Sequence, residues 1–341
     1  MTGVATPPRR AMPTAERQAR ASLYRDGRPP SRRFLWLLAA GLISGVFSAA
    51  VKADASTFAT QPVAEGVYVH VGAQADANPE NRGDIANISF VIGNRCAAVI
   101  DTGGSRAVGA ALLDALRAQT RVPVCYVINT HMHPDHLFGN GAFATIDEVQ
   151  FVGHRKLAPA LAARRDNYLR VLEDQIGARA ADNPLIPTNS PIDSTQQLDL
   201  GGRTLTLQPW PTAHTDNDLT VYDDKTGTLW TGDLLFVGRI PVIDGSVIGW
   251  RKAIDSLHEQ TPRHVVPGHG PIDPPWPAAL EDETRYLDQL TTEVRAALKQ
   301  GRTLAQTIES AGNIERPHWL LFDDYNRRNA TACYTELEWE E

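Results

Sequence analysis

Cysteine is scarce in this 341-residue sequence, and that scarcity limits the kinds of site and scaffold the chain can form. Its three cysteines, Cys96, Cys125 and Cys333, are too few for a zinc module built from cysteine, and an odd number cannot pair completely. Hydrophobic residues make up 42% of the chain and charged residues 21%, which excludes a disordered or fibrous protein. We therefore expect a globular protein with a substantial core.

The main body of the chain also lacks an excess of positive charge. Residues 1–55 contain eight arginines and one lysine against three acidic residues, a net charge of +6, whereas the remaining 286 residues carry −13. An acidic body has no electrostatic reason to bind nucleic acid or an anionic membrane surface. We expect a small-molecule substrate, with no nucleic acid as a partner.

The N-terminal region has the features of an export signal. Arg32 and Arg33 precede an uncharged apolar run from Phe34 to Val51, and small residues follow at positions 53–55. This order predicts a signal peptide of the twin-arginine type and a periplasmic protein with no stable membrane span after processing. A retained anchor facing the periplasm is the alternative, although glycines and serines in the run disfavour it. We expect residues 1–55 to be a disordered basic region with the signal peptide, and residues 56–341 to be the functional domain.

Beyond residue 60, short apolar runs alternate with helical patterns. Three helices are expected, the first capped by Ser105, the second over about 155–176 and the third over about 278–300. This mixture predicts an α/β protein. The nine strands expected from runs of Val, Ile, Thr and aromatic residues are 67–71, 88–92, 97–101, 124–129, 149–153, 205–208, 219–222, 228–231 and 264–267.

The strongest chemical signal is an H-x-H-x-D-H string at the end of the strand predicted over 124–129. His131 and His133 alternate on extended chain and project to one side, and Asp135 and His136 follow next to them. Neutral imidazoles and a carboxylate are the ligands that zinc and similar divalent ions prefer. The string therefore predicts a metal site.

Three later residues lie where other predicted strands run into loops. His214, Asp233 and His269 would each be weak evidence alone, because a single histidine beside a strand is more often structural. Loops at strand ends are, however, where α/β proteins build their sites. Taken in order, the chain offers seven candidate metal ligands for two ions: His131, His133, Asp135, His136, His214, Asp233 and His269.

The order of these motifs, with Asp101-Thr102-Gly103-Gly104 before them, resembles the five-motif signature of metallo-β-lactamase-fold hydrolases over about residues 62–300. The segments 86–90 and 239–245 are similar to the subgroup of quinoprotein relay system zinc metallohydrolases. The family implies a four-layer αβ/βα sandwich with the metal site at the edge of two central sheets. It also implies one zinc ion on His131, His133 and His214 and a second on Asp135, His136 and His269. Asp233 would bridge the two ions, and Asp101 would be a structural acid beneath them.

The resemblance implies a hydrolase in which a hydroxide bridging the ions attacks an ester, thioester, lactone or lactam carbonyl. Asp135 would be the catalytic residue that orients this nucleophile or carries its proton. Other divalent ions, including iron, fit the same ligands.

Other functions stay open. A β-lactamase is one, although the cysteine-ligated type has Cys at the position of Asp233. Another is a non-catalytic metal-binding protein that serves a periplasmic quinoprotein dehydrogenase. A glutathione-thioester hydrolase would need a basic C-terminal patch, and we interpret Arg327 and Arg328 as solvated charges instead.

Smaller expectations concern residues near the motifs. Arg239 either anchors an anionic substrate group or pairs with an acid such as Asp244. Trp210 and Trp250 either line the pocket mouth or belong to the core. Because parallel neighbouring strands point their Cβ atoms the same way, we expect Cys96 and Cys125 to be two buried thiols and not a disulfide. The remaining histidines lack ligand spacing and are expected to be structural or exposed: His70, His154, His258, His264 and His318.

Overall fold

The computed structural model describes residues 58–340, and all structural statements concern this part of the chain. The predicted basic region and signal peptide lie outside the described residues. Within residues 58–340, no helix combines the length and the apolar composition needed to cross a bilayer.

Seven strands form the first sheet, and their order in space is their order along the chain. The pairs from β1 to β4 are antiparallel, and the pairs from β4 to β7 are parallel. Because β4 and β5 are parallel neighbours, the loops that follow them leave the sheet at the same edge. The strands are β1 (Gln61–Ala64), β2 (Val67–His70), β3 (Ile88–Ile92), β4 (Ala97–Ile100), β5 (Val124–Ile128), β6 (Gln150–His154) and β7 (Ser190–Ile192).

Five strands form the second sheet, in the order β12-β11-β10-β9-β8. The strands β8 to β11 pair antiparallel in succession, whereas β11 and β12 are parallel. A parallel pair needs a crossover connection, which α4 (Val247–His258) provides. The strands are β8 (Gln196–Asp199), β9 (Thr204–Pro209), β10 (Leu219–Asp223), β11 (Thr228–Phe236) and β12 (His264–His269).

The two sheets face each other across an apolar core. Val67 and Val69 of β2 and Leu205 and Leu207 of β9 belong to the same buried cluster. The spacing of two within each pair follows from the alternation of side chains along a strand, which sends every second residue to the same face. Apolar residues from both sheets therefore hold the central layers together.

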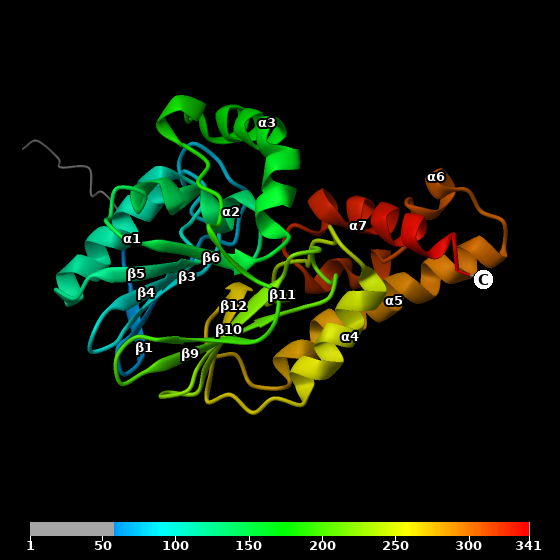
Figure 1. The fold of residues 1–341 in the computed structure, drawn as a ribbon. Helices are drawn as coiled ribbons and strands as arrows, with labels where there is room; N and C mark the ends of the chain where they lie inside the picture. Colours follow the sequence, from blue (N-terminus) through cyan, green and yellow to red (C-terminus); the bar gives the residue numbers. More distant parts are fainter. Residues whose placement is uncertain (1–57, 341) are drawn as a thin grey trace, which may run out of the picture. The chain divides into compact units, whose positions relative to one another are not determined.

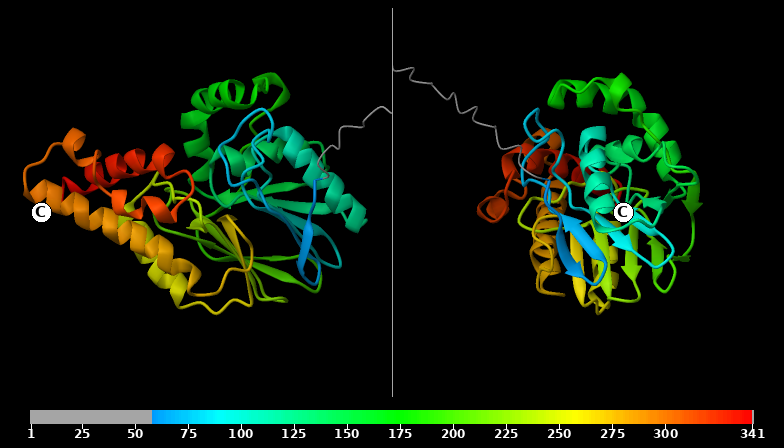
Figure 2. Two further views of the ribbon diagram at one scale, coloured as in Figure 1. Left: turned by 180° about the vertical axis from the view of Figure 1, so that it is seen from behind. Right: turned by 90° about the vertical axis from the view of Figure 1, so that its left-hand side faces the viewer.

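Helices cover the outer faces of both sheets. α1 begins after Ser105, whose hydroxyl accepts the backbone N–H of Val108, and its Leu112 and Leu116 pack in one cluster with Phe90 of β3. On the other side, α4 and α5 pack against β11, and α7 packs against α5 (Figure 1). Figure 2 shows from behind that the C-terminal helices lie on the opposite side from α1. The helices besides α4 are α1 (Arg106–Gln119), α2 (Pro134–Leu137), α3 (Leu157–Ile176), α5 (Ala279–Lys299), α6 (Leu304–Thr307) and α7 (Phe322–Leu337).

These layers confirm the predicted αβ/βα sandwich, and each of the nine predicted strands overlaps an observed one. The three strands that were not predicted have three or four residues and little apolar pattern; β8 buries only Leu198. The helix α4 was also missed, although Val247, Trp250, Ile254 and Leu257 form a buried stripe at helical spacing.

The expectation of free thiols at Cys96 and Cys125 is wrong, because the structure joins them in a disulfide. Their Cα atoms are 5.8 Å apart, within the usual range. The expectation assumed regular pairing, but the register shifts so that Ala97 and Ala98 of β4 face Val124 and Tyr126 of β5. Cys125 is the extra residue between these partners, and such a bulge re-aims a side chain. The free, buried thiol is Cys333.

Candidate metal centre

Loops and strand ends from both sheets meet at one edge of the sandwich. From the first sheet, Asp101 directly follows β4, and residues 130–136 follow β5 and enter α2. From the second sheet, His214 lies in the loop after β9, Asp233 lies within β11, and His269 is the last residue of β12. Asp233 and His269 were expected just beyond their strands; β11 and β12 extend further than their apolar runs indicate.

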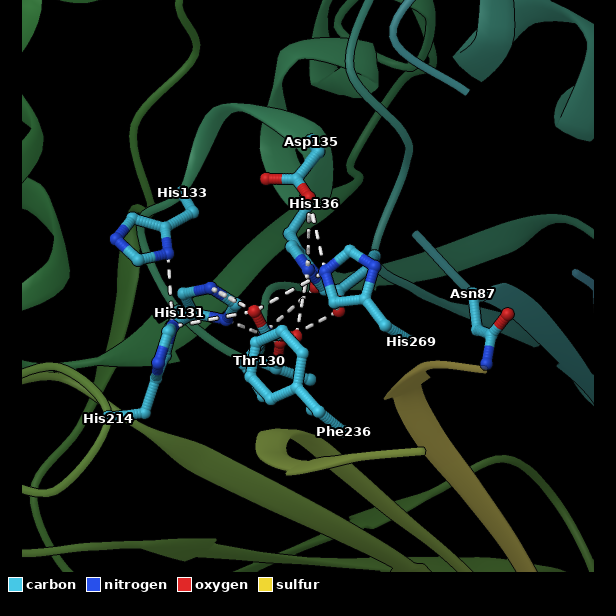
Figure 3. A network of polar contacts seen from close by, with 12 residues as sticks. Asn87, Thr130, His131, His133, Asp135, His136, His214, Phe236 and His269 are labelled. Carbon is cyan, nitrogen blue, oxygen red and sulfur yellow. Dashed lines mark hydrogen bonds and ion pairs between the residues drawn. The ribbon is translucent and has the colours of Figure 1, made fainter. Parts of the chain in front are cut away.

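The seven predicted ligands converge on this edge in two adjacent groups (Figure 3). Within each group, one potential ligand atom per residue lies within 4.8 Å of the others. The first group contains His131, His133, His214 and Asp233, and the second contains Asp135, His136 and His269. All seven residues that the sequence singled out are therefore brought together.

The carboxylate of Asp233 lies between the two groups. Its Oδ2 is 3.6 Å from Nε2 of His131 and 3.4 Å from Nε2 of His214 in the first group. In the second group, Oδ2 is 3.4 Å from Nε2 of His269, and Oδ1 is 3.1 Å from Nε2 of His136. A single carboxylate thus faces imidazoles of both groups, as a ligand shared by two ions must.

Two of the imidazoles, those of His214 and His269, are oriented by hydrogen bonds from Nδ1 to backbone carbonyls. His214 donates from Nδ1 to the carbonyl of Val242 at 2.6 Å, and His269 donates from Nδ1 to the carbonyl of Ile85 at 2.8 Å. Each bond fixes the tautomer and leaves the lone pair of Nε2 directed at the centre. Second contacts of this kind are characteristic of histidines that bind metals.

His133 has the opposite orientation. Its Nε2 lies 3.1 Å from a carboxylate oxygen of Asp244, and its Nδ1 lies 3.0 Å from Nε2 of His214. A proton on Nε2, donated to Asp244, leaves the lone pair of Nδ1 directed into the first group. Asp244, which was expected only as a possible partner of Arg239, therefore holds the orientation of His133.

Asp101 lies beneath both groups and is buried. Its carboxylate accepts hydrogen bonds from the backbone N–H of Thr130 at 2.8 Å, the hydroxyl of Thr130 at 2.7 Å and Nδ1 of His136 at 2.8 Å. The same hydroxyl oxygen lies 3.1 Å from Nδ1 of His131. Asp101 has a φ of 56°, a conformation that non-glycine residues rarely adopt. These contacts agree with the structural role expected for Asp101.

Three buried atoms at the centre have no hydrogen-bond partner among the described residues. They are Nε2 of His131, Nε2 of His136 and Oδ1 of Asp233. A buried polar atom without a partner is costly, and native proteins generally satisfy such atoms. Nitrogen and carboxylate donors directed at one another from several sides fit a divalent cation.

Burial and charge shift the pKa values of the four most buried histidines of the centre in opposite directions. Burial lowers the pKa of His131 well below its usual value and lowers that of His214 to about 3. Burial alone would raise the pKa of Asp233. The charges of His136 and His269 lower this pKa by more than burial raises it, so the carboxylate stays ionised. Burial opposes charge on His136 and His269 too, yet Asp233 raises the pKa of both. A metal ion binds deprotonated ligands and would compete with these two protons.

A cavity of about 400 Å³ opens beside the two groups. Asp135 and Asp233 line it, together with His133 and His269, so the candidate ligands are accessible to a small molecule. The side chain of Asp135 is 18% exposed, whereas that of Asp233 is 3% exposed. Asp135 is therefore the site carboxylate that a substrate can reach more easily.

Arg239 lines the same cavity and is buried. Its guanidinium donates to the carbonyl of Ala75 at 3.3 Å, lies 3.8 Å from the carboxylate of Asp76 and stacks over the ring of Tyr325 at 5.6 Å. Its Nε has no partner in the described chain. Arg239 does lie beside an acid, as one of the two expectations had it, but that acid is Asp76 and not Asp244, which lies against His133.

Three further cavity residues could not be recognised from the sequence: Arg164 of α3 and Tyr325 and Arg328 of α7. Their helices are far from the ligand motifs along the chain, and only the fold brings them to the cavity. Arg328, interpreted as a solvated charge, in fact lines the cavity, whereas Arg327 pairs with Glu309 on the surface.

The other expectations near the motifs are settled by burial and contacts. Trp250 is fully buried and donates to the carbonyl of Leu234, and Trp210 donates to Thr220, so both tryptophans belong to the core. Among the described residues, none of the five remaining histidines belongs to a potential metal-binding group.

Comparisons with a family sequence model and with solved structures agree with this fold and this candidate metal centre. Residues 81–269 match the sequence model of the metallo-β-lactamase superfamily. A β-lactamase domain protein from Burkholderia ambifaria shares 18% identity and a TM-score of 0.61 over 83% of this chain and 89% of that one. A metallo-β-lactamase from Pontibacter korlensis shares 20% identity and a TM-score of 0.54 over 67% of this chain and 98% of that one. No curated protein sequence gives a significant match. Since the family model covers more than half of the sequence, this chain belongs to the metallo-β-lactamase superfamily of metal-dependent hydrolases.

Proposed function

We propose that this protein is a hydrolase that uses two divalent metal ions, with zinc as the expected metal. We propose that it cleaves an ester, thioester, lactone or lactam. The observation that carries the proposal is the position of Asp233 between two groups of ligands, with unpartnered nitrogens directed at it from both sides. A protein with a single metal site would have no use for the second group.

The residues divide between the ions as the geometry suggests. His131, His133 and His214 would hold the first ion, Asp135, His136 and His269 would hold the second, and Asp233 would serve both. Divalent ions held there would supply Lewis-acid chemistry for hydrolysis at neutral pH.

Two residues of the chain act on the substrate and its protons. Asp135 faces the cavity, and its carboxylate lies 3.3 Å from Nε2 of His269. Burial would raise the pKa of Asp135, but the charge of His136 lowers it more, so the carboxylate is ionised and can orient a water molecule by accepting a hydrogen bond from it. Arg239, which is buried and has an unpartnered Nε, binds an anionic group of the substrate next to this carboxylate.

Metal analysis of the purified protein tests the proposal, together with a panel of ester, lactone, thioester and β-lactam substrates. We expect about two divalent ions per chain. His131→Ala and Asp233→Asn should each lose most of the bound metal and nearly all hydrolysis, because each removes a direct ligand. His258→Ala, a change at an exposed histidine of α4, is the matched control and should keep both. A fully active protein with one ion per chain would contradict the two-ion proposal.

Two alternatives make different predictions for the same panel. A β-lactamase is favoured by the names of the similar solved structures, and it would hydrolyse β-lactams faster than the other substrates. A non-catalytic accessory protein for a quinoprotein dehydrogenase would bind metal and hydrolyse nothing. The cavity beside the ligand groups supports the hydrolase over the accessory protein.

We also propose that the protein is exported to the periplasm and serves a quinoprotein system there. The Cys96–Cys125 disulfide supports export, because disulfides persist in oxidising compartments. Replacing Arg32 and Arg33 by lysine should leave an unprocessed precursor in the cytoplasm if the twin-arginine route is used. Unchanged export would favour the general secretory route or an anchor.

A further inference from the structure

Two arginines from distant helices meet at the cavity. Arg164 belongs to α3 and Arg328 to α7, and both line the cavity beside the candidate metal ligands. A guanidinium nitrogen of Arg164 lies 3.5 Å from Oδ2 of Asp244, and one of Arg328 lies 3.7 Å from Oδ1. The carboxylate of Asp244 therefore has one arginine beside each oxygen.

The charges of this cluster are not balanced. Asp244 is the one ion-pair partner of either arginine within the described residues, and it also accepts from His133. One negative charge thus faces two guanidiniums. In the described chain neither guanidinium donates a hydrogen bond, and their side chains are 38% and 53% exposed, so their N–H groups are available to a ligand.

The wall that α3 gives to the cavity is mostly apolar. Tyr168, Val171, Leu172 and Ile176 of α3 line the cavity together with Phe138, and two amide side chains of the same helix, Asn167 and Gln175, also line it. Their spacing places them on one face of the helix, and Arg164 lies one turn before Tyr168 on that face. The arginines lie close to the candidate metal ligands, because Asp244, which both of them contact, also contacts His133. A ligand held by the arginines therefore has the metal ligands within reach and the apolar side chains of α3 beside it.

We propose that Arg164 and Arg328 bind a carboxylate of the substrate, whose apolar part lies along α3 while its scissile carbonyl is at the metal ligands. The substrate class is then an acyl compound with an acidic end. A carboxylate is the group of choice because guanidiniums bind it with paired hydrogen bonds, and because the carboxylate of Asp244 already lies between these two arginines. This inference rests on the proposed hydrolase function for the position of the carbonyl.

The test compares the binding of straight-chain diacids with that of monoacids of equal carbon number, from four to eight carbons, by isothermal titration calorimetry. The protein is loaded with zinc, so that both series offer one carboxylate to the bound ions and only the diacids offer a second. We expect at least one diacid to bind about tenfold or more tightly than its monoacid, because a charged hydrogen-bond partner contributes about 1.5–3 kcal/mol.

Matched variants isolate the two arginines. Arg164→Gln with Arg328→Gln should abolish the preference for the diacid, measured as the ratio of the diacid affinity to the monoacid affinity. The control is Arg165→Gln with Arg327→Gln, which removes the same charge from the neighbouring positions of the same helices. Arg165 and Arg327 are exposed and pair with Asp166 and Glu309 on the surface. The control should keep the preference.

Turnover provides a second measurement. Wild-type protein should hydrolyse the mono-4-nitrophenyl ester of the preferred diacid with a higher kcat/KM than the ester of the matching monoacid, and the Arg164/Arg328 variant should lose this difference. A diacid preference without hydrolysis of any ester would support the arginine site and contradict the hydrolase. No diacid preference at any length, or an equal loss in the control variant, would overturn the arginine site.

Discussion

Replacing Asp101 with Asn tests how the centre is held together. Three donors converge on the Asp101 carboxylate: the N–H and the hydroxyl of Thr130 and Nδ1–H of His136. An asparagine amide has one oxygen, so its NH₂ group must face at least one of these donors. The change keeps the shape of the side chain and removes only the charge and one acceptor.

The expected cost follows from the loss of one charged hydrogen bond in a buried place. A hydrogen bond to a charged group contributes about 1.5–3 kcal/mol, and a buried donor left without a partner costs about 1–3 kcal/mol. We expect Asp101→Asn to lower the free energy of unfolding by about 3 kcal/mol, measured by urea denaturation of the metal-free protein. Because His136 loses the partner that orients it, metal affinity should fall about 10- to 100-fold, measured by competition with a chromophoric chelator.

Asp223→Asn is the matched control. Asp223 is also a fully buried carboxylate, and it accepts from Thr226 and pairs with Arg203 at 3.4 Å, in β10 and outside both ligand groups. The Asp223→Asn variant should have a lower free energy of unfolding and the metal affinity of the wild type. Wild-type metal affinity in Asp101→Asn, or an equal loss in Asp223→Asn, would refute the idea that Asp101 positions His136 for metal binding.

Two further predictions concern the rest of the fold. Thiol counting on the unfolded, unreduced protein should find one free thiol, and three free thiols would show that the bond does not form. Replacing both Cys96 and Cys125 with serine should lower the free energy of unfolding by roughly 3–4 kcal/mol, the entropic contribution expected for closing a loop with a separation of 29 residues. Burial lowers the pKa of His70, but its hydrogen bond to Asp84 at 2.8 Å raises it more, so the net shift is upward. The pair therefore stabilises the fold below the usual histidine pKa of about 6.5, and this contribution is lost as the pH rises through the folded-state pKa. Asp84→Asn should be destabilising at pH 5.5 and nearly neutral at pH 9 in urea denaturation; a loss that does not depend on pH would mean that the charge of His70 is not involved.

The candidate ligands could be located from the sequence because their spacing is largely local. His131, His133 and His136 lie within one short segment, and His214, Asp233 and His269 each follow or end an apolar run, so the pattern of runs located them. The nine strands that were predicted were recognisable from their composition, since buried strands are rich in Val, Ile and aromatic residues.

The cavity was not predictable, because its walls come from elements that only the tertiary structure brings together. Nothing in the sequence around Arg164 or Arg328 distinguishes them from their neighbours Arg165 and Arg327, which lie on the surface. The Cys96–Cys125 bond was missed for a related reason: a shift of one residue in strand register decides where Cys125 points, and that shift leaves no mark in the pattern of apolar residues.

The division of the ligands between the two sheets determines when during folding the centre can exist. His131, His133, Asp135 and His136 come from the first sheet, whereas His214, Asp233 and His269 come from the second. A folding intermediate with only one sheet formed would offer an incomplete set of donors and would lack one side of the Asp233 contacts. An ion that binds only the complete set of donors stabilises only the state in which the two sheets are docked. Such an ion would bind after both sheets have formed.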